Sequence, residues 1–491
     1  MESLQIALLL GVFLLMAVLM FLRKIPALIA LPLMAVLIAL FGGVSVEHVI
    51  QFVIGKGSLK LYPAYTVAMF GSMLSVILQK TGVAESFIKK GAELSGDNPW
   101  IIAVIMLILI TLLFTTLGGL GAIIMVATIV LPIMSSVGIG SITTVGIFLI
   151  GLSIGGTLNV GNWAVYVSVM NLTVSEIRPF ALLMFAITFI AALVYITIQL
   201  YKDGHELNIV RIFRNSIFAI AIISLIILSY FYLFSIDLQI QIDNVLSLLG
   251  TIITWAIGIS ILLLFGAAIF RMLNNKFEDS KEPHWISFFS PIIPLFLIIL
   301  FDIDFIAAFI IGLLFAFLST YKKGRLNLFI QSVFEGGGVV MPAVALMFGI
   351  GMLLVAIMGP GVDLPEYTTG WPVIELLKPL MHYIVPSTPI AYILIFTLAA
   401  PLALYRGPLN VWGMGYGLAA VFLASGLNPG AVMGLLLAVG QIQGISDPTN
   451  THNVWLANEM RVDVQKILWN TIPYTWIIAF IGLSFAAIMF L

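Results

Sequence analysis

The chain contains no cysteine and few charged residues. Without cysteine it can form no disulfide, no thiol nucleophile and no cysteine metal site. Charged residues make up 9% of its 491 residues, whereas a soluble domain averages roughly 25%. A soluble protein of this length could not cover its surface with so little charge, so we expect lipid to be its main solvent. The net charge of −1 gives no field that favours nucleic acid, and no nucleic-acid partner is expected.

Catalytic and metal-binding patterns are also scarce. The five histidines are scattered, without metal-ligand spacing. Gly151, Ser153 and Gly155 fit the motif G-x-S-x-G, but they lie in an apolar run, and that motif indicates a nucleophile only at a strand-turn-helix junction. We therefore expect no enzyme and no resident cofactor, apart from H⁺ or Na⁺ as a coupling ion. A membrane-embedded enzyme stays a remote alternative.

Long apolar runs dominate what is present. Hydrophobic residues make up 62% of the chain, and its mean hydropathy is +1.18. Since a helix needs about 20 apolar residues to cross a bilayer, the sequence predicts an all-α polytopic protein, with the lipid bilayer of a prokaryotic plasma membrane as a partner. Full spans are predicted at 4–21, 25–42, 62–79, 179–200, 215–235, 246–270, 285–301, 302–319, 335–358 and 467–490.

The loops between these spans carry a charge bias. Loops 201–214, 271–284 and 320–326 hold lysines and arginines, and two spans separate each loop from the next, so that all three lie on one face. Basic loops of membrane proteins stay in the cytoplasm. We therefore predict that these three loops are cytoplasmic and that both chain ends lie outside.

The two halves of the chain resemble each other. VAMFGSML at 67–74 corresponds to VALMFGIGML at 344–353, and TLGGLGA at 116–122 corresponds to LYRGPLN at 404–410. Corresponding spans are expected to run in opposite directions, which is the inverted-topology repeat of many secondary transporters. The predicted domains are a first inverted repeat at 1–200, a linker with two extra transmembrane helices at 201–284, and a second inverted repeat at 285–491.

In each repeat, two apolar stretches are interrupted by glycine, proline and polar residues. We predict re-entrant helical hairpins at 100–136 and 388–424, and discontinuous transmembrane helices at 141–170 and 430–460. Non-helical backbone at membrane depth is tolerated only where protein buries it or where it lines a wet cavity. Four paired interruptions therefore indicate one central site between the halves.

The run SDPTNTHN at 446–453 is the most specific of these interruptions. A carboxylate at mid-bilayer costs roughly 2.5–3.5 kcal/mol on insertion scales, so Asp447 must be paired, protonated or bound to a cation. We predict an ion-coupling group of Asp447, Ser446 and Thr449, with a Na⁺ site near Asp447 or an H⁺ cycle on its carboxyl group. The alternatives are an extramembrane loop and an aspartate that only caps a helix.

Arg406 lies between an apolar segment and a glycine-rich helix. A buried guanidinium binds a carboxylate through a bidentate fork, whereas an arginine at a helix end can extend to the interface instead. The sequence leaves both interpretations open. The first break, with Thr157, Asn159 and Asn162, either lines a ligand site or holds helices together.

The segment YRGPLNVWGMGYGLAAVFLASGLNPGAVMGLLLAVG, followed by SDPTNTHNVWLANEMRVDVQKILWN, resembles the gluconate/proton symporter family. That family is part of the ion-transporter superfamily that also contains citrate and C4-dicarboxylate carriers. The resemblance implies a carrier of small organic anions that holds its substrate between hairpin tips and helix breaks. Carried over by position, the residues that would line the site are Arg406, Asn410, Asp447, Asn450 and Thr451.

Together these features predict a secondary transporter that moves a small carboxylate, such as gluconate, citrate or a C4-dicarboxylate, with H⁺ or Na⁺. The sequence itself gives no oligomeric state; a homodimer is what the resemblance allows, because related carriers are often dimers. A cation/proton antiporter on the same scaffold is the main alternative. The predicted substrate-binding residues are Arg406, Gly407, Asn410, Asn450, Thr451, Asn453, Gly119, Thr157, Asn159 and Asn162.

Overall fold

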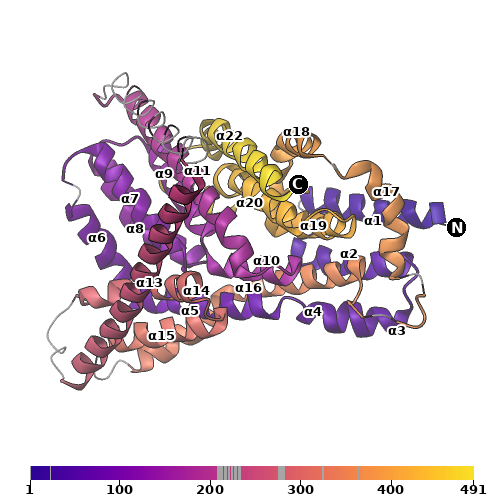
Figure 1. Ribbon diagram of the computed structural model, residues 1–491, viewed down its shortest axis with the longest axis horizontal. Coiled ribbons are helices and arrows are strands. Elements are labelled where there is room, and N and C mark those ends of the chain that lie inside the picture. The colour runs from indigo at the N-terminus through magenta and orange to yellow at the C-terminus, as the bar shows by residue number, and fades with distance from the viewer. Residues whose placement is uncertain are drawn as a thin grey trace.

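All regular structure in the described part of the chain is helical (Figure 1). The computed structural model describes residues 2–22, 24–94, 96–206, 234–274, 282–322, 326–362, 364–368, 370–386 and 388–491, with isolated residues between 207 and 233. Within these ranges no strand occurs. The prediction of an all-α chain is therefore confirmed.

Up to residue 202 the helices follow one another with short connections. They are α1 (Glu2–Phe21), α2 (Ala27–Phe41), α3 (Val46–His48), η1 (Val49–Lys56), α4 (Gly57–Leu59), α5 (Tyr62–Lys80), α6 (Val83–Leu94), α7 (Pro99–Phe114), α8 (Leu120–Ser136), α9 (Ser141–Thr157), α10 (Val160–Met170) and α11 (Val174–Lys202). The later ones are α13 (Ile236–Leu273), η3 (Trp285–Phe289), α14 (Ile293–Phe301), α15 (Phe305–Thr320), α16 (Leu326–Met358), α17 (Pro372–Ile384), α18 (Pro389–Ala399), η4 (Ala400–Arg406), η5 (Val411–Gly415), α19 (Tyr416–Ala424), α20 (Pro429–Ser446), α21 (Thr451–Glu459) and α22 (Val464–Phe490).

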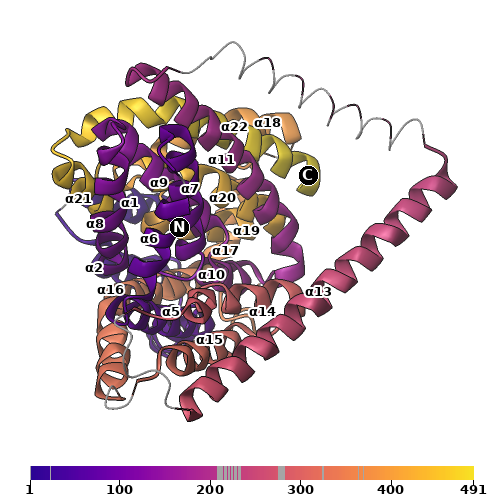
Figure 2. The same ribbon diagram turned by 90° about the vertical axis from the view of Figure 1, so that its left-hand side faces the viewer.

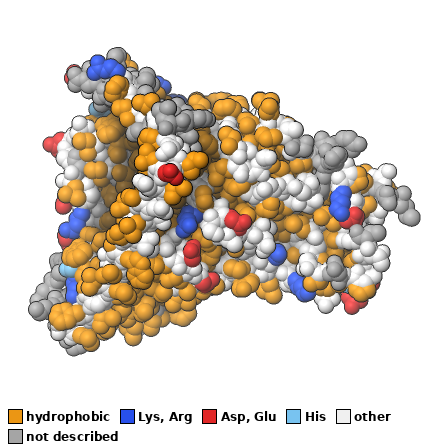
Figure 3. Space-filling model, in the orientation of Figure 1, with side chains coloured by type: hydrophobic (Ala, Val, Ile, Leu, Met, Phe, Trp, Pro, Cys, Tyr) orange, Lys and Arg blue, Asp and Glu red, His pale blue; other side chains and the backbone are white. Residues whose placement is uncertain are grey.

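The helices have the length and the surface of a membrane protein. Among the described residues, eight helices are long and apolar enough to cross a membrane, and the bent pair α9 and α10 makes a ninth if it counts as one span. Apolar side chains cover most of the face in Figure 3, and charged side chains are few on it. Helix α13 runs along the outside of the bundle (Figure 2), with most of its side chains exposed. The chain is a multi-pass membrane protein.

Predicted spans 25–42 and 302–319 correspond to the shorter apolar helices α2 and α15, and the predicted span 285–301 is wrong. Segment 285–301 forms the 3₁₀ turn η3 and the nine-residue helix α14. At 1.5 Å per residue, such a helix covers about 14 Å, half of the hydrocarbon core. Pro291 lies between the two pieces, and Pro294 stands in the first turn of α14, where a proline starts a helix and cannot continue one. The predicted span 215–235 and the basic parts of the three loops predicted to be cytoplasmic fall largely outside the described residues.

Helix α16 packs along the helical stretch from η1 to α5. Glycines make this close approach possible: a Cβ on Gly336 would lie 2.5 Å from the Cα of Met73, and a Cβ on Gly57 would lie 2.8 Å from the Cα of Met352. Small residues let membrane helices approach until their backbones touch. Because the later residue of one helix meets the earlier residue of the other, the two run antiparallel.

Each segment that was predicted as a hairpin contains helices joined by a short non-helical tip. Residues 115–119 separate α7 from α8, and Gly119 there has a φ of 84°. Residues 407–410 separate η4 from η5, next to Tyr405 and Arg406 with φ of 55° and 56°. The chain bends by 49° between α9 and α10, and residues 447–450 separate α20 from α21. The inverted relation of the two halves stays a prediction.

Candidate functional site

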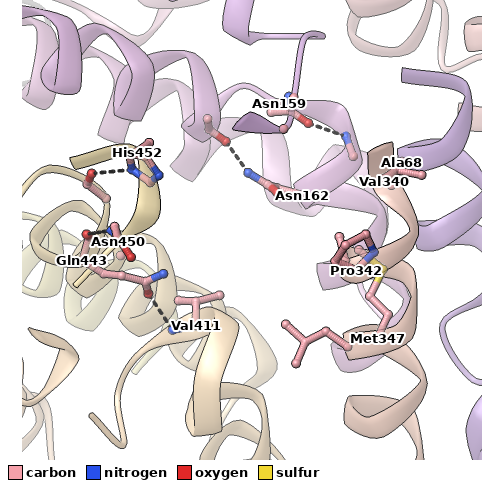
Figure 4. Close-up of a pocket in the computed structure, with 18 of the residues that line it drawn as sticks. Ala68, Asn159, Asn162, Val340, Pro342, Met347, Val411, Gln443, Asn450 and His452 are labelled. Carbon is pink, nitrogen blue, oxygen red and sulfur yellow. Dashed lines mark hydrogen bonds between the residues drawn. The ribbon is translucent and has the colours of Figure 1, made fainter. Parts of the chain in front are cut away.

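Both hairpin tips and both helix breaks border one cavity of about 1000 Å³. Figure 4 shows Asn159 and Asn162 on one side, Gln443 and Asn450 on a second, and Met347 of α16 on a third. The walls combine apolar side chains from α2, α5, α15, α16 and α20 with a polar group from the tips and breaks. The polar side chains are Ser72, Thr116, Ser153, Thr157, Asn159, Asn162, Arg406, Asn410, Gln441, Gln443, Thr449, Asn450, Thr451 and His452.

The structure brings most of the predicted site residues to this cavity. Those that line it are Gly119, Thr157, Asn159, Asn162, Arg406, Asn410, Thr449, Asn450 and Thr451. Four others, Gly407, Ser446, Asp447 and Asn453, are buried beside it and do not line it. Two of these four are held by neighbouring groups: the Ser446 hydroxyl contacts Thr471 Oγ1 at 2.8 Å, and Asn453 Nδ2 donates to the Ile445 carbonyl at 3.1 Å.

Asp447 ties the second helix break to the second hairpin tip. Its carboxylate is fully buried and accepts hydrogen bonds from the backbone N–H groups of Tyr405 at 3.1 Å and Arg406 at 3.4 Å. Asn410 Nδ2 donates to it at 3.4 Å, and Thr449 donates from its N–H at 2.9 Å and its hydroxyl at 2.7 Å. These donors satisfy the buried carboxylate, as a buried charge requires.

Asn159 plays the corresponding part in the first half. Its Nδ2 donates to the carbonyl oxygens of Phe114 at 3.0 Å and Leu117 at 3.4 Å, at the end of α7 and the following tip. Its Oδ1 accepts from the Gly161 N–H at 2.9 Å and caps α10. Thus in each half, one side chain at the helix break holds the hairpin tip of that half.

Two glutamines that line the cavity, Gln441 and Gln443, were not predicted from the sequence. Gln441 joins the halves, because its Oε1 accepts from the Ser153 hydroxyl at 2.8 Å and its Nε2 donates to Thr157 Oγ1 at 3.0 Å. Gln443 accepts a hydrogen bond from the Val411 N–H at 2.6 Å. The available signal was a pair of amide side chains two residues apart in an otherwise apolar, glycine-rich helix.

The charge in the cavity wall is of one sign. Arg406 is exposed and lines the cavity, and the described lining residues include no aspartate or glutamate. Among the ion pairs between described residues, none involves Arg406. A guanidinium without a carboxylate partner in a largely apolar cavity can receive the carboxylate of a ligand.

Comparisons with known proteins find a similarity of structure but none of sequence family. No family model matches the chain, and no curated protein matches it. Among eleven matching chains of solved structures is the YdaH transporter of Alcanivorax borkumensis, described as having an unusual topology. It matches with a TM-score of 0.51 and 11% identity over 89% of this chain and 86% of that one. The chain has the fold of a membrane transporter. An identity this low supports the fold alone.

Proposed function

We propose that this protein is a secondary active transporter of a small organic anion, a carboxylate such as gluconate, citrate or a C4-dicarboxylate, coupled to H⁺ or Na⁺ in a prokaryotic plasma membrane. The observation that carries the proposal is Arg406, which lines the central cavity from a hairpin tip while no carboxylate lies among the described lining residues. The guanidinium would bind the substrate carboxylate through paired N–H groups.

The two helix breaks support the same assignment. Helices α10 and α21 begin at Val160 and Thr451, and Asn159, Asn162, Asn450 and Thr451 from their first turns line the cavity. The first N–H groups of a helix have no partner within the helix, and the helix dipole is positive there. Two helix N-termini at one cavity therefore favour a bound anion.

The contacts of Asp447 favour one of its two proposed roles. An ion-coupling carboxylate needs an oxygen that can take a proton or a cation. Both oxygens of Asp447 are already used as acceptors. The N–H groups of Tyr405, Arg406 and Thr449, the side-chain amide of Asn410 and the hydroxyl of Thr449 all donate to them. We therefore propose Asp447 as the anchor of the hairpin tip that carries Arg406, and leave the seat of the coupling ion unassigned.

Ligand-induced stabilisation tests the proposal directly. A ligand that binds only the native state must raise its stability. A panel of gluconate, citrate, C4-dicarboxylates and uncharged sugars should give a concentration-dependent rise in melting temperature for at least one carboxylate and for no uncharged compound. Stabilisation by Na⁺ alone, with no effect of any carboxylate, would contradict the proposal and favour a cation/proton antiporter.

A further inference from the structure

Gln443 occupies a position from which it can act on the same ligand as Arg406. It lies in the last turn of α20, its side chain is largely buried, and it lines the cavity. Asn450 Nδ2 donates to the backbone carbonyl oxygen of Gln443 at 2.6 Å. This hydrogen bond holds the last turn of α20 against the start of α21 and leaves the Gln443 side chain unaffected. A buried amide in an apolar wall is expected to have its hydrogen-bonding groups satisfied.

Only one end of the Gln443 amide is satisfied. Its Oε1 accepts from the Val411 N–H at 2.6 Å, and among the described residues no acceptor contacts its Nε2. Because the Val411 N–H can only donate, the amide must place its oxygen toward that N–H and its NH₂ group on the other side. Figure 4 shows this nitrogen turned away from Val411 toward the middle of the cavity.

The neighbouring Gln441 makes the contrast clear. Its Oε1 accepts from Ser153, and its Nε2 donates to Thr157 Oγ1 and to the Leu437 carbonyl. Both ends of that amide are in use, so it joins two helices and has little left for a ligand. Gln443, two residues later, keeps both N–H groups of its amide.

Gln443 and Arg406 are held by contacts between the same two segments. Arg406 donates its backbone N–H to Asp447, and Val411, five residues later on the same tip, donates to Gln443, four residues before Asp447. Asp447, at the end of α20, therefore holds the backbone of Arg406, while the Val411 N–H on the tip side holds the side-chain amide of Gln443.

We infer that Gln443 is a specificity-determining residue of the substrate site: its NH₂ group donates to the substrate carboxylate beside Arg406, and the Val411 N–H holds it in the orientation that can do so. This inference rests on the proposed function. It assigns the second donor of the anion site, and it makes anion binding depend on the position of the hairpin tip relative to α20.

Substitutions at Gln443 test the donor. Gln443→Glu keeps the shape and the contact with Val411 but turns an oxygen toward the anion, and Gln443→Met removes the donor without adding charge. For the carboxylate that stabilises the wild-type protein, both should raise the Kd by about tenfold or more, the range for a lost hydrogen bond to a charged group. Gln51→Glu, at an exposed position away from the cavity, controls for the added charge and should leave the Kd unchanged.

A double-mutant cycle tests the orientation. Val411→Pro removes the N–H that Gln443 accepts from, and the backbone can accept a proline there, because Val411 begins η5 and Asn410 before it has φ −69° and ψ 119°, values that a residue preceding proline adopts. Val411→Ala, which keeps the N–H, controls for the altered side chain in the cavity wall. Val411→Pro should weaken carboxylate binding in the wild-type background and have no further effect in Gln443→Met, since the two act through one contact.

The outcomes separate the inference from the proposed function. Carboxylate binding by the wild type with a Kd within twofold in both Gln443 variants would overturn the inference and leave the proposed function intact. Absence of carboxylate binding by the wild type would overturn both. If Gln443→Glu lowers the melting temperature of the free protein, Gln443→Met decides between these results.

Discussion

At the scale of single residues, one buried carboxylate places the cationic group of the site. Asp447 holds the N–H groups of Tyr405 and Arg406, both of which have positive φ. Non-glycine residues rarely adopt this backbone conformation unless their surroundings impose it. The anchor therefore defines where the Arg406 side chain leaves the hairpin tip.

Replacement of Arg406 tests the substrate contact. Arg406→Lys keeps the charge but loses the planar fork, so the Kd for the stabilising carboxylate should rise by about 10-fold to 100-fold, with an unchanged melting temperature of the free protein. Arg461 is a matched control, because it also has a positive φ, of 54°, is exposed, and lies outside the cavity wall. Equal Kd values for Arg406→Lys, Arg461→Lys and the wild type would remove Arg406 from the site.

Replacement of Asp447 tests the anchor. An asparagine side chain at this position would present an NH₂ group to N–H donors and leave them unpaired, so Asp447→Asn should lower the free energy of unfolding by about 2–4 kcal/mol. It should also abolish substrate binding and exchange together. Asp463→Asn is the control, because Asp463 caps α22 from an exposed position, and asparagine caps equally well. Loss of gradient-driven accumulation with intact exchange and stability would instead support ion coupling at Asp447.

The residues of the site differ in how far the sequence could predict them. Arg406 and Asp447 stood out because charged residues are costly in apolar runs. The sequence could not show that Asp447 faces the hairpin tip and not the cavity, since that depends on contacts about 40 residues apart in the chain. Gln443 was missed because an uncharged amide in a glycine-rich helix gives little signal, and its orientation depends on Val411.

At the scale of elements, the contact between α16 and the stretch η1 to α5 depends on glycine. Gly336→Ala should destabilise the protein, because its Cβ would meet the Met73 backbone, which cannot move aside. Gly338→Ala on the same helix meets open space and should stabilise by about 0.5–1 kcal/mol through helix propensity. Melting temperatures of the two variants check this, and equal shifts of the same sign would contradict the proposed packing.

Helix positions were largely predictable, and their exact lengths were not. Apolar runs such as 179–200 and 467–490 lie within the long helices α11 and α22. For such long uninterrupted runs, hydropathy is sufficient to predict a spanning helix. Segment 285–301 is equally apolar, but its prolines divide it into η3 and α14. Hydropathy does not distinguish a spanning helix from a short apolar helix packed within the protein.

At the scale of the whole molecule, the basic loops predict the orientation in the membrane. Because 285–301 is not one full span, loops 271–284 and 320–326 share a face only if α14 and α15 together enter and leave the membrane on the same side. Single cysteines introduced at Asn208, Lys276 and Lys323 of this cysteine-free chain should all resist an impermeant maleimide in intact cells and react after permeabilisation. A cysteine at position 2, close to the chain end that is predicted to lie outside, should react in intact cells. The reverse pattern would invert the orientation.

The proposed function requires that the cavity carry a carboxylate across the membrane together with an ion. The most direct measurement is uptake of the stabilising carboxylate into proteoliposomes under an imposed H⁺ or Na⁺ gradient, with the wild type and Arg406→Lys side by side. We expect concentrative uptake by the wild type that collapses with the gradient, and strongly reduced uptake by the lysine variant at equal reconstitution. Exchange of Na⁺ for H⁺ without movement of any carboxylate would contradict the proposed function.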